Sequence, residues 1–113
     1  TKEYRPDSGG AGRMRGGHGQ NIEIESRIGE PFELLAAYDR IDHPARGRDG
    51  GKDGAPGVVA FKSGKTLPGK GFLMVPADER LVIKTPGGGG IGNPAERDPE
   101  RVAAERKAGL VTE

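Results

Sequence analysis

A run of four consecutive glycines, Gly87 to Gly90, is the feature of this sequence that points most directly to chemistry. Glycine gives the main chain access to positive φ and lets it lie close to another surface. Successive N–H groups in such a run can form a concave site for an anion. The alternative, which we favour, is a tight crossing in which the bare main chain packs against strands. Either role explains why the sequence accepts the entropy lost when four glycines become fixed.

Charged side chains form a second candidate site within residues 39–57, a segment rich in glycine. An arginine can bind a carboxylate or a phosphate through two parallel hydrogen bonds. A segment of this length without regular structure is usually functional or disordered. The binding residues that we predict here are Arg46, Arg48, Asp49 and Lys52.

Four aspartates in the same segment raise the alternative of a cation site. Hard cations prefer oxygen ligands, but the spacing of Asp39, Asp42, Asp49 and Asp53 does not follow an EF-hand loop. The neighbouring arginines compete for these carboxylates. We therefore expect salt bridges that order the segment, and we predict no metal site in this chain.

Two short stretches match parts of nucleotide-binding motifs, but the residues around them argue against such sites. Residues 63–66 end like a phosphate-binding loop, but Val59 stands where the motif needs glycine, and residues 67–69 exclude the helix that must follow. Residues 87–92 match Gly-x-Gly-x-x-Gly, but the Asn-Pro of residues 93–94 blocks a helix there. We expect a hairpin turn at the first match and no dinucleotide site at the second.

The two histidines lack the neighbouring ligands or catalytic groups that metal binding or catalysis requires. His18 lies between glycines and His43 precedes a proline, so neither has a partner at helical spacing. We expect both to be solvated or hydrogen-bonded loop residues. Ser8 is outside the Gly-x-Ser-x-Gly context of an activated nucleophile, so it is not predicted to be catalytic.

Short apolar runs predict five strands that position these residues. Residues 20–27 alternate isoleucine with glutamate, which is typical of a half-buried strand. Residues 32–38 fit a strand or a short helix, and we favour the strand. The remaining predicted strands, separated by short turns, are residues 58–62, 71–75 and 80–84. Short connections favour antiparallel neighbours.

One helix is predicted after the glycine run, with signals at both ends. Asp98 is a good N-cap and Pro99 suits the first helical position. Arg106 and Lys107 favour the negative end of the helix dipole, and Gly109 is a typical stop. Because the helix has few apolar residues, we expect it to lie on a surface or against a partner.

Composition predicts a small, loop-rich β domain with a thin core. The chain has 113 residues, of which 21 are Gly and 9 are Pro, with no Trp and no Cys. Cores of this size are marginal alone, so we expect partner surface to complete it. The lack of cysteine excludes a disulfide framework. A net charge of +1 without a basic stripe argues against nucleic-acid binding. We find no internal repeat of fixed period.

The sequence also indicates where the protein is located in the cell and whether the chain is part of a longer polypeptide. No apolar stretch approaches the roughly 20 residues that span a bilayer, and no signal peptide is recognised. We therefore expect a cytoplasmic protein that does not enter a membrane. Because the chain opens on Thr1 rather than Met, we expect residues 1–113 to be a single domain within a longer polypeptide.

Three stretches, in order, resemble the C-terminal part of the B (beta) subunit of the hydantoinase/5-oxoprolinase family. They are residues 5–20, residues 39–40 with 50–57, and residues 85–100 with 109–111. Each stretch alone is only glycine-rich, but their shared order makes the signal specific. Ile91 stands where an aromatic residue is expected. The family pattern continues past Glu113, so the resemblance implies a C-terminal fragment of a larger subunit.

The resemblance implies an ATP-dependent enzyme that opens cyclic amides such as N-methylhydantoin or 5-oxoproline. In that family an actin-like A subunit handles ATP and phosphorylates the amide oxygen. The B subunit, which has a metal site, then supports hydrolysis of the activated ring. The implied partners are the rest of the B subunit and the A subunit, and the implied cofactors of the complete enzyme are ATP and a divalent metal. Because the family's metal ligands are expected upstream of this chain, the segment should bind no cofactor and catalyse nothing alone.

The sequence therefore predicts a mainly β, antiparallel, glycine-rich domain with long loops and one C-terminal helix. Its predicted role is the C-terminal module of a cyclic-amide hydrolase. Two alternatives stay open. One is a non-catalytic interaction or assembly module, and the other is part of an acetone-carboxylase-type enzyme, which would depend on bicarbonate rather than water.

Overall fold

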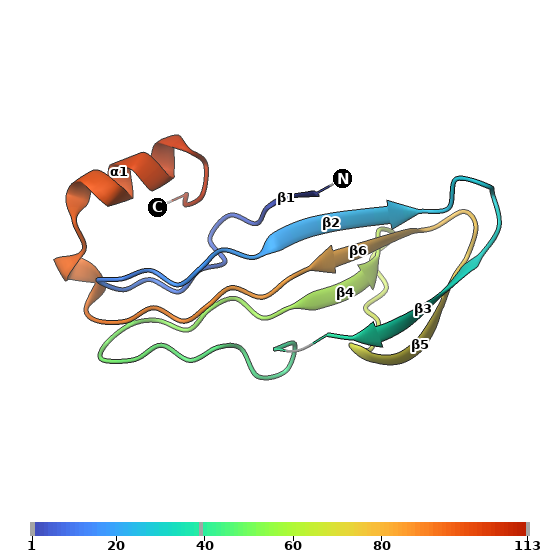
Figure 1. Ribbon diagram of the computed structural model, residues 1–113, viewed down its shortest axis with the longest axis horizontal. Coiled ribbons are helices and arrows are strands. Elements are labelled where there is room, and N and C mark those ends of the chain that lie inside the picture. The colour runs from blue at the N-terminus through green and yellow to red at the C-terminus, as the bar shows by residue number, and fades with distance from the viewer. Residues whose placement is uncertain (1, 39, 113) are drawn as a thin grey trace.

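A computed structural model describes residues 2–38 and 40–112, and it shows six strands and a C-terminal helix among them (Figure 1). The molecule is elongated, with extents of 51 × 27 × 17 Å. The elements, in chain order, are β1 (Lys2–Tyr4), β2 (Gln20–Glu25), β3 (Phe32–Ala37), β4 (Val58–Phe61), β5 (Lys70–Val75), β6 (Arg80–Lys84), the 3₁₀ turn η1 (Pro94–Glu96) and the helix α1 (Pro99–Lys107).

The strands form two antiparallel sheets. One sheet has the order β1-β2-β6-β4, and the other pairs β3 with β5. In the larger sheet Ile83 of β6 lies opposite Ile22 on one side and opposite Val59 on the other. Because successive side chains alternate between faces, this register puts the apolar residues of three strands on one face.

The hydrophobic core lies between the two sheets and is small. Its buried members are Val59, Leu81 and Ile83 from the larger sheet and Val75 from β5. Leu81 and Val75 are fully buried. Partly buried residues such as Phe32 pack around them. A thin core was predicted from the low content of large apolar residues, and this packing agrees with it.

The predicted fold class is confirmed, as are the five predicted strands to within two residues at each end. The ambiguous residues 32–38 form a strand. The predicted turn at residues 63–64 is confirmed, because the Gly64 N–H donates to the Phe61 carbonyl at 2.9 Å. The short elements β1 and η1 were not predicted.

Helix α1 has the predicted ends. The Asp98 side chain accepts a hydrogen bond from the Glu100 N–H, and Pro99 is the first helical residue. At the other end Gly109 has a φ of 77°, and the Leu110 N–H donates to the Glu105 carbonyl at 2.9 Å. This is the Schellman arrangement, which explains why the helix ends at a glycine.

Candidate functional site

Five extended segments outside the sheets lie side by side and form what we call the glycine bundle. They are residues 8–12, 14–19, 45–48, 51–55 and 85–91. Figure 1 shows residues 14–19, 51–55 and 85–91 continuing from the ends of β2, β4 and β6, with α1 alongside. Their N–H groups donate to carbonyls of neighbouring segments, mostly at 2.7–3.1 Å. The bundle is thus built by main chain contacting main chain.

The hydrogen bonds of the bundle repeat every three residues. In residues 85–91 the N–H groups of Gly87 and Gly90 donate to the carbonyls of Ala55 and Lys52 in residues 51–55. The N–H groups of Gly88 and Ile91 donate to the carbonyls of Gly17 and Met14 in residues 14–19. From residues 51–55 the donor–acceptor pairs are Gly54 to Ala45, Lys52 to Ala11 and Ala55 to Ser8. A β-strand repeats every two residues, whereas the polyproline II helix has three residues per turn and no internal hydrogen bonds. The segments are therefore of polyproline II type.

Residues 85–91 are the central segment, because each of the other four segments hydrogen-bonds to it. Its neighbours approach so closely that no side chain fits at Gly87, Gly89 or Gly90, which explains most of the glycine run. A Cβ at Gly87 would overlap the Ser8 carbonyl, and one at Gly89 would overlap the Arg46 carbonyl. A Cβ at Gly90 would overlap the Ala11 carbonyl.

The close-approach role of the glycine run is therefore confirmed, with its neighbours supplied by this same chain. None of Gly87 to Gly90 has a positive φ. The alternative anion nest is not formed, since the N–H groups of Gly87, Gly88 and Gly90 already donate to carbonyls. Whether the run also contacts a ligand or partner stays a prediction.

The second predicted site lies on two outer segments of the bundle. The Arg48 N–H donates to the Gly90 carbonyl and the Lys52 N–H to the Ala11 carbonyl. Their main chains thus lie against the bundle, while the residues Arg46, Arg48, Asp49 and Lys52 are exposed. The structure brings the main chain of this group close to the central segment, and its binding role stays a prediction.

The expectation that salt bridges order residues 39–57 is wrong for the residues that the structure describes; Asp39 lies outside them. None of the ion pairs found between described residues involves Asp42, Asp49 or Asp53. The Asp53 carboxylate instead accepts a hydrogen bond from the Gly47 N–H at 2.8 Å. Order comes from the backbone bonds of the bundle, so residues 44–55 are not a free loop.

A buried charge cluster fastens α1 to the bundle, and sequence analysis missed it. Glu105 of α1 pairs with Arg15 at 3.1 Å and also with Arg97. The side chains of both arginines are 8% exposed and that of Glu105 is 15% exposed. Arg97 also donates to the Arg13 carbonyl at 3.0 Å. Arg15 is far from Glu105 in the chain, and Arg97 lies eight residues before Glu105, outside the helix, so helical spacing could not reveal either pair.

Two polar residues at the start of the bundle hold other segments in place. Ser8 is buried, donates to the Arg5 carbonyl at 2.7 Å and accepts from the Gly19 N–H at 2.8 Å. Asp7 accepts from both the hydroxyl and the N–H of Thr112. These two hydrogen bonds lower the pKa of Asp7 below its ordinary value, and the bond from the Thr112 hydroxyl has the larger effect. Both side chains act structurally.

Neither histidine belongs to a candidate metal-binding group among the described residues. His18 is half-buried and His43 is exposed. His18 was expected to be solvated or hydrogen-bonded, yet its Nδ1 is buried without a hydrogen-bond partner among the described residues. Within residues 2–38 and 40–112 no group of three or more His, Cys, Asp or Glu residues could hold a metal ion. No described helix is long and apolar enough to cross a membrane.

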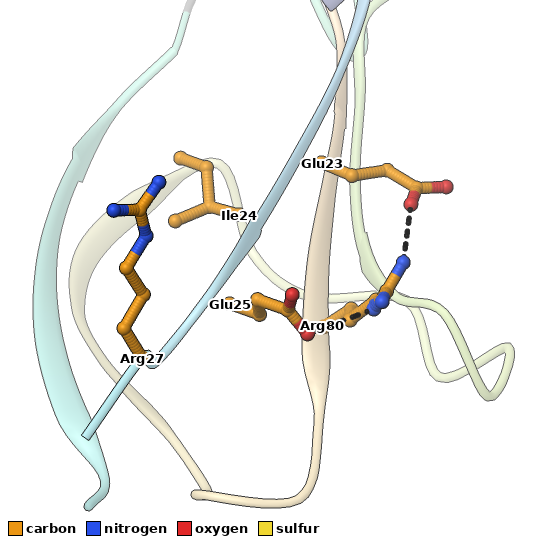
Figure 2. Close-up of a pocket in the computed structure, with 5 residues that line it drawn as sticks. All are labelled: Glu23, Ile24, Glu25, Arg27 and Arg80. Atoms are coloured by element: carbon orange, nitrogen blue, oxygen red, sulfur yellow. Dashed lines mark hydrogen bonds and ion pairs between the residues drawn. The ribbon is translucent and has the colours of Figure 1, made fainter. Parts of the chain in front are cut away.

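A shallow pocket of about 270 Å³ lies at the other end of the molecule, on β2 and β6. Figure 2 shows Arg80 directed toward Glu23 and Glu25, with Ile24 and Arg27 at the opposite wall. Arg80 bonds to Glu25 at 3.1 Å and to Glu23 at 3.4 Å. A hydrogen bond from Lys62 and the Arg80 contact both lower the pKa of Glu23. These cross-strand pairs neutralise each other's charge, which is a structural role.

A wider groove of about 740 Å³ runs beside the segment that follows β3. Ile41 and Leu67 form apolar parts of its wall, and His43 lies on it as well. The groove was not predicted from the sequence. Charged residues on its lining besides His43 are Arg40, Asp42 and Lys70.

Comparisons with known proteins agree with the family suggested by the sequence. The Hydantoinase B/oxoprolinase family matches residues 1–94. The chain is 37% identical over 114 residues to the 5-oxoprolinase PfmaA of Pestalotiopsis fici, which covers 93% of this chain and 9% of the relative. It is 40% identical to 5-oxoprolinase 1 of Arabidopsis thaliana over 79% of this chain and 7% of the relative.

A bacterial relative gives the same picture. The putative B subunit of a D-/L-hydantoinase from Pseudomonas sp. is 30% identical over 97% of this chain and 19% of the relative. No solved structure gave a significant match. The chain spans less than a fifth of the length of each of these three relatives. On the extent of the family match, this chain belongs to the hydantoinase B/oxoprolinase family.

Proposed function

We propose that this chain is one domain, the C-terminal module, of a cytoplasmic ATP-dependent enzyme that opens cyclic amides such as hydantoins or 5-oxoproline. The observation that carries the proposal is the family match over residues 1–94, together with relatives named as 5-oxoprolinases and as the B subunit of a hydantoinase. Alone, the module catalyses nothing. Its partners are the rest of a B-type subunit and, through it, an actin-like ATP-binding A subunit.

The glycine bundle supports a scaffolding role within that enzyme. Main chains that contact one another directly leave little room for movement, because every displacement breaks several hydrogen bonds at once. Such a framework can hold the surrounding polypeptide in a fixed geometry. Arg46, Arg48 and Lys52 lie on its outer segments, Asp49 lies in the turn between them, and all four are exposed. We propose that these side chains contact the rest of the subunit or an anionic group at its active site.

The chemistry of ring opening comes from elsewhere in the enzyme. Phosphorylation of the amide oxygen by ATP would make the ring carbon more electrophilic. Water would add there, and the ring C–N bond would break as the nitrogen takes a proton. A second water would hydrolyse the resulting acyl phosphate to a carboxylate and inorganic phosphate. The divalent metal implied for the family does not fit the described residues of this chain, which bring no three His, Asp, Glu or Cys residues together. We therefore assign no step of the reaction to this segment.

A chimaeric enzyme tests the proposal. Residues 1–113 replace the matching region of 5-oxoprolinase 1 from Arabidopsis thaliana, and hydrolysis of 5-oxoproline is measured with and without ATP. We expect a soluble chimaera with ATP-dependent turnover, and no turnover by the 113 residues alone. Turnover by the isolated chain, or an inactive chimaera whose circular dichroism matches the parent, contradicts the proposal.

Two further measurements on the chimaera separate the alternatives. Turnover that requires bicarbonate rather than water favours the carboxylase-type alternative. Replacing Arg46 and Arg48 with alanine should lower turnover several-fold without changing the melting temperature. Unchanged turnover in that variant means that these arginines take no part in binding, and it leaves only a packing role for the segment.

A further inference from the structure

Gly17 is the one bundle glycine in the described segments that nothing in this chain explains. At Gly9, Gly16 and Gly19, the other glycines nearby, an added Cβ would overlap a carbonyl oxygen. Gly50 and Gly92 have a positive φ, which itself favours glycine. Gly17 has neither property, because its φ is not positive and an added Cβ would find no atom within 4 Å.

The hydrogen bonds of Gly17 are also incomplete. Its carbonyl accepts from the Gly88 N–H at 2.9 Å, which places the residue firmly in the bundle. Among the described residues nothing accepts a hydrogen bond from its N–H. Gly17 is exposed, and an added Cβ there would point into open space, so its bare Cα faces outward.

Apolar side chains lie next to this surface. Residues three apart share a face of a polyproline II helix, so Met14 lies on the same face as Gly17. Met14 is paired with Ile91 through two backbone hydrogen bonds, each of 2.9 Å. Both side chains are 47% exposed. We call these three exposed residues, Gly17, Met14 and Ile91, the Gly17 face.

We propose that the Gly17 face binds one further extended peptide segment of polyproline II type, supplied from outside these 113 residues. The contact continues the interface already present in the bundle, where the bare main chain of Gly16 lies against the carbonyl of Gly88. The segment carries glycine opposite the bare Cα of Gly17, and proline or another apolar residue against Met14 and Ile91.

The relatives contain ample polypeptide to supply such a segment, because this chain matches only 9% of one and 19% of another. The proposal does not depend on the hydrolase activity. It concerns how the bundle is extended, and a bundle of this kind could be extended in any larger subunit.

The test uses the full 113-residue chain and a blocked synthetic peptide of four Gly-Gly-Pro repeats as the probe. Amide and methyl NMR shifts are followed during titration of the chain with the peptide. We expect saturable shifts confined to Gly17, Met14 and Ile91. The variant Gly17→Leu should fold with an unchanged urea midpoint, since the space is open, and should bind the probe at least tenfold more weakly.

The matched control is Ser63→Leu, which adds the same apolar bulk at an exposed turn on another part of the molecule. It should bind the probe like the parent chain. Four results overturn the proposal: no shifts at millimolar peptide, binding that Gly17→Leu leaves unchanged, concentration-dependent shifts at Gly17 without peptide, and a lowered urea midpoint in Gly17→Leu. The third result makes a second copy of the chain the occupant, and the fourth shows that this chain already fills the space.

Discussion

The glycine bundle and the core between the two sheets both exclude water from their interiors, but by opposite means. In the core, Leu81 and Val75 exclude water by filling space with side chains. In the bundle, residues 85–91 exclude water because side chains are missing and neighbouring main chains can touch. One region gains stability from apolar burial, and the other from hydrogen bonds between densely packed backbones.

This difference predicts opposite tolerance to substitution. The core should suffer when atoms are removed, because a cavity forms. The bundle should suffer when atoms are added, because no space exists for them. A single methyl group therefore has opposite consequences in the two regions of one small chain.

The largest effect is expected for Gly87→Ala. The new methyl would overlap the Ser8 carbonyl, which is main chain and cannot rotate away. Overpacking of this kind should cost more than about 3 kcal/mol of unfolding free energy. The measurement is a urea titration followed by circular dichroism and amide NMR, in which the bundle resonances should collapse toward random-coil shifts.

Alanine substitutions at two other glycines of the bundle, Gly88 and Gly17, serve as comparisons for the loss of unfolding free energy at Gly87. At Gly88 the nearest atom to an added Cβ is the Gly17 nitrogen at 3.1 Å, so Gly88→Ala should cost about 1 kcal/mol. At Gly17 the space is open, and Gly17→Ala should change the unfolding free energy by less than about 0.5 kcal/mol. Equal effects of all three substitutions would contradict the packing account.

The core counterpart is Leu81→Ala, for which we expect a loss of about 3 kcal/mol. Leu81 is fully buried between the sheets, so truncation leaves a cavity there. The same urea titration measures the loss. Leu81→Met keeps most of the volume and serves as the control, with an expected change below about 1.5 kcal/mol. A harmless Leu81→Ala would show that the core contributes little.

The junction between helix and bundle gives a smaller effect. Glu105→Gln removes the negative charge that the two largely buried arginines Arg15 and Arg97 share. We expect a loss of about 2 kcal/mol, below the range for fully buried pairs because the cluster is partly exposed. Glu100→Gln, an exposed residue on the same helix, is the control. A matching loss in both variants points to helix propensity instead.

The smallest effect is a pH dependence at Asp7. Its pKa is lowered in the folded chain by the Thr112 hydrogen bonds, so its carboxylate stabilises the fold above the ordinary Asp pKa. That contribution is lost as pH falls through the lowered pKa. Thr112→Val should raise the pKa of Asp7 toward its ordinary value and weaken the dependence.

Carboxyl ¹³C NMR measures this titration directly. Thr66→Val, at an exposed position elsewhere, should leave the Asp7 titration unchanged. If Thr112→Val also leaves it unchanged, the Thr112 hydroxyl does not hold the carboxylate.

The sequence predicted the sheets and the helix well because their signals are local. Alternating isoleucines marked β2, and Asp98, Pro99 and Gly109 marked the ends of α1. The pairing of β2 with β6 was not predicted, since it joins segments about sixty residues apart in the chain and depends on the whole fold.

The bundle was missed for a different reason. Glycines recur three residues apart at Gly9 and Gly12, Gly16 and Gly19, Gly51 and Gly54, and Gly87 and Gly90. Gly-X-Y spacing of this kind accompanies polyproline II packing in collagen, and it was overlooked because no long repeat exists. The sequence has no internal repeat of fixed period, so these short spacings were not recognised as a signal.

Hydrogen-bond scalar couplings provide the most direct test of the polyproline II bundle. A long-range HNCO spectrum of the labelled 113-residue chain detects couplings from each donor nitrogen to its acceptor carbonyl carbon. The account predicts couplings from Gly87 to Ala55 and Gly90 to Lys52, and from Gly88 to Gly17, with the three-residue repeat of these bonds. A two-residue repeat of couplings, or random-coil shifts for residues 85–91 in the folded chain, would contradict it.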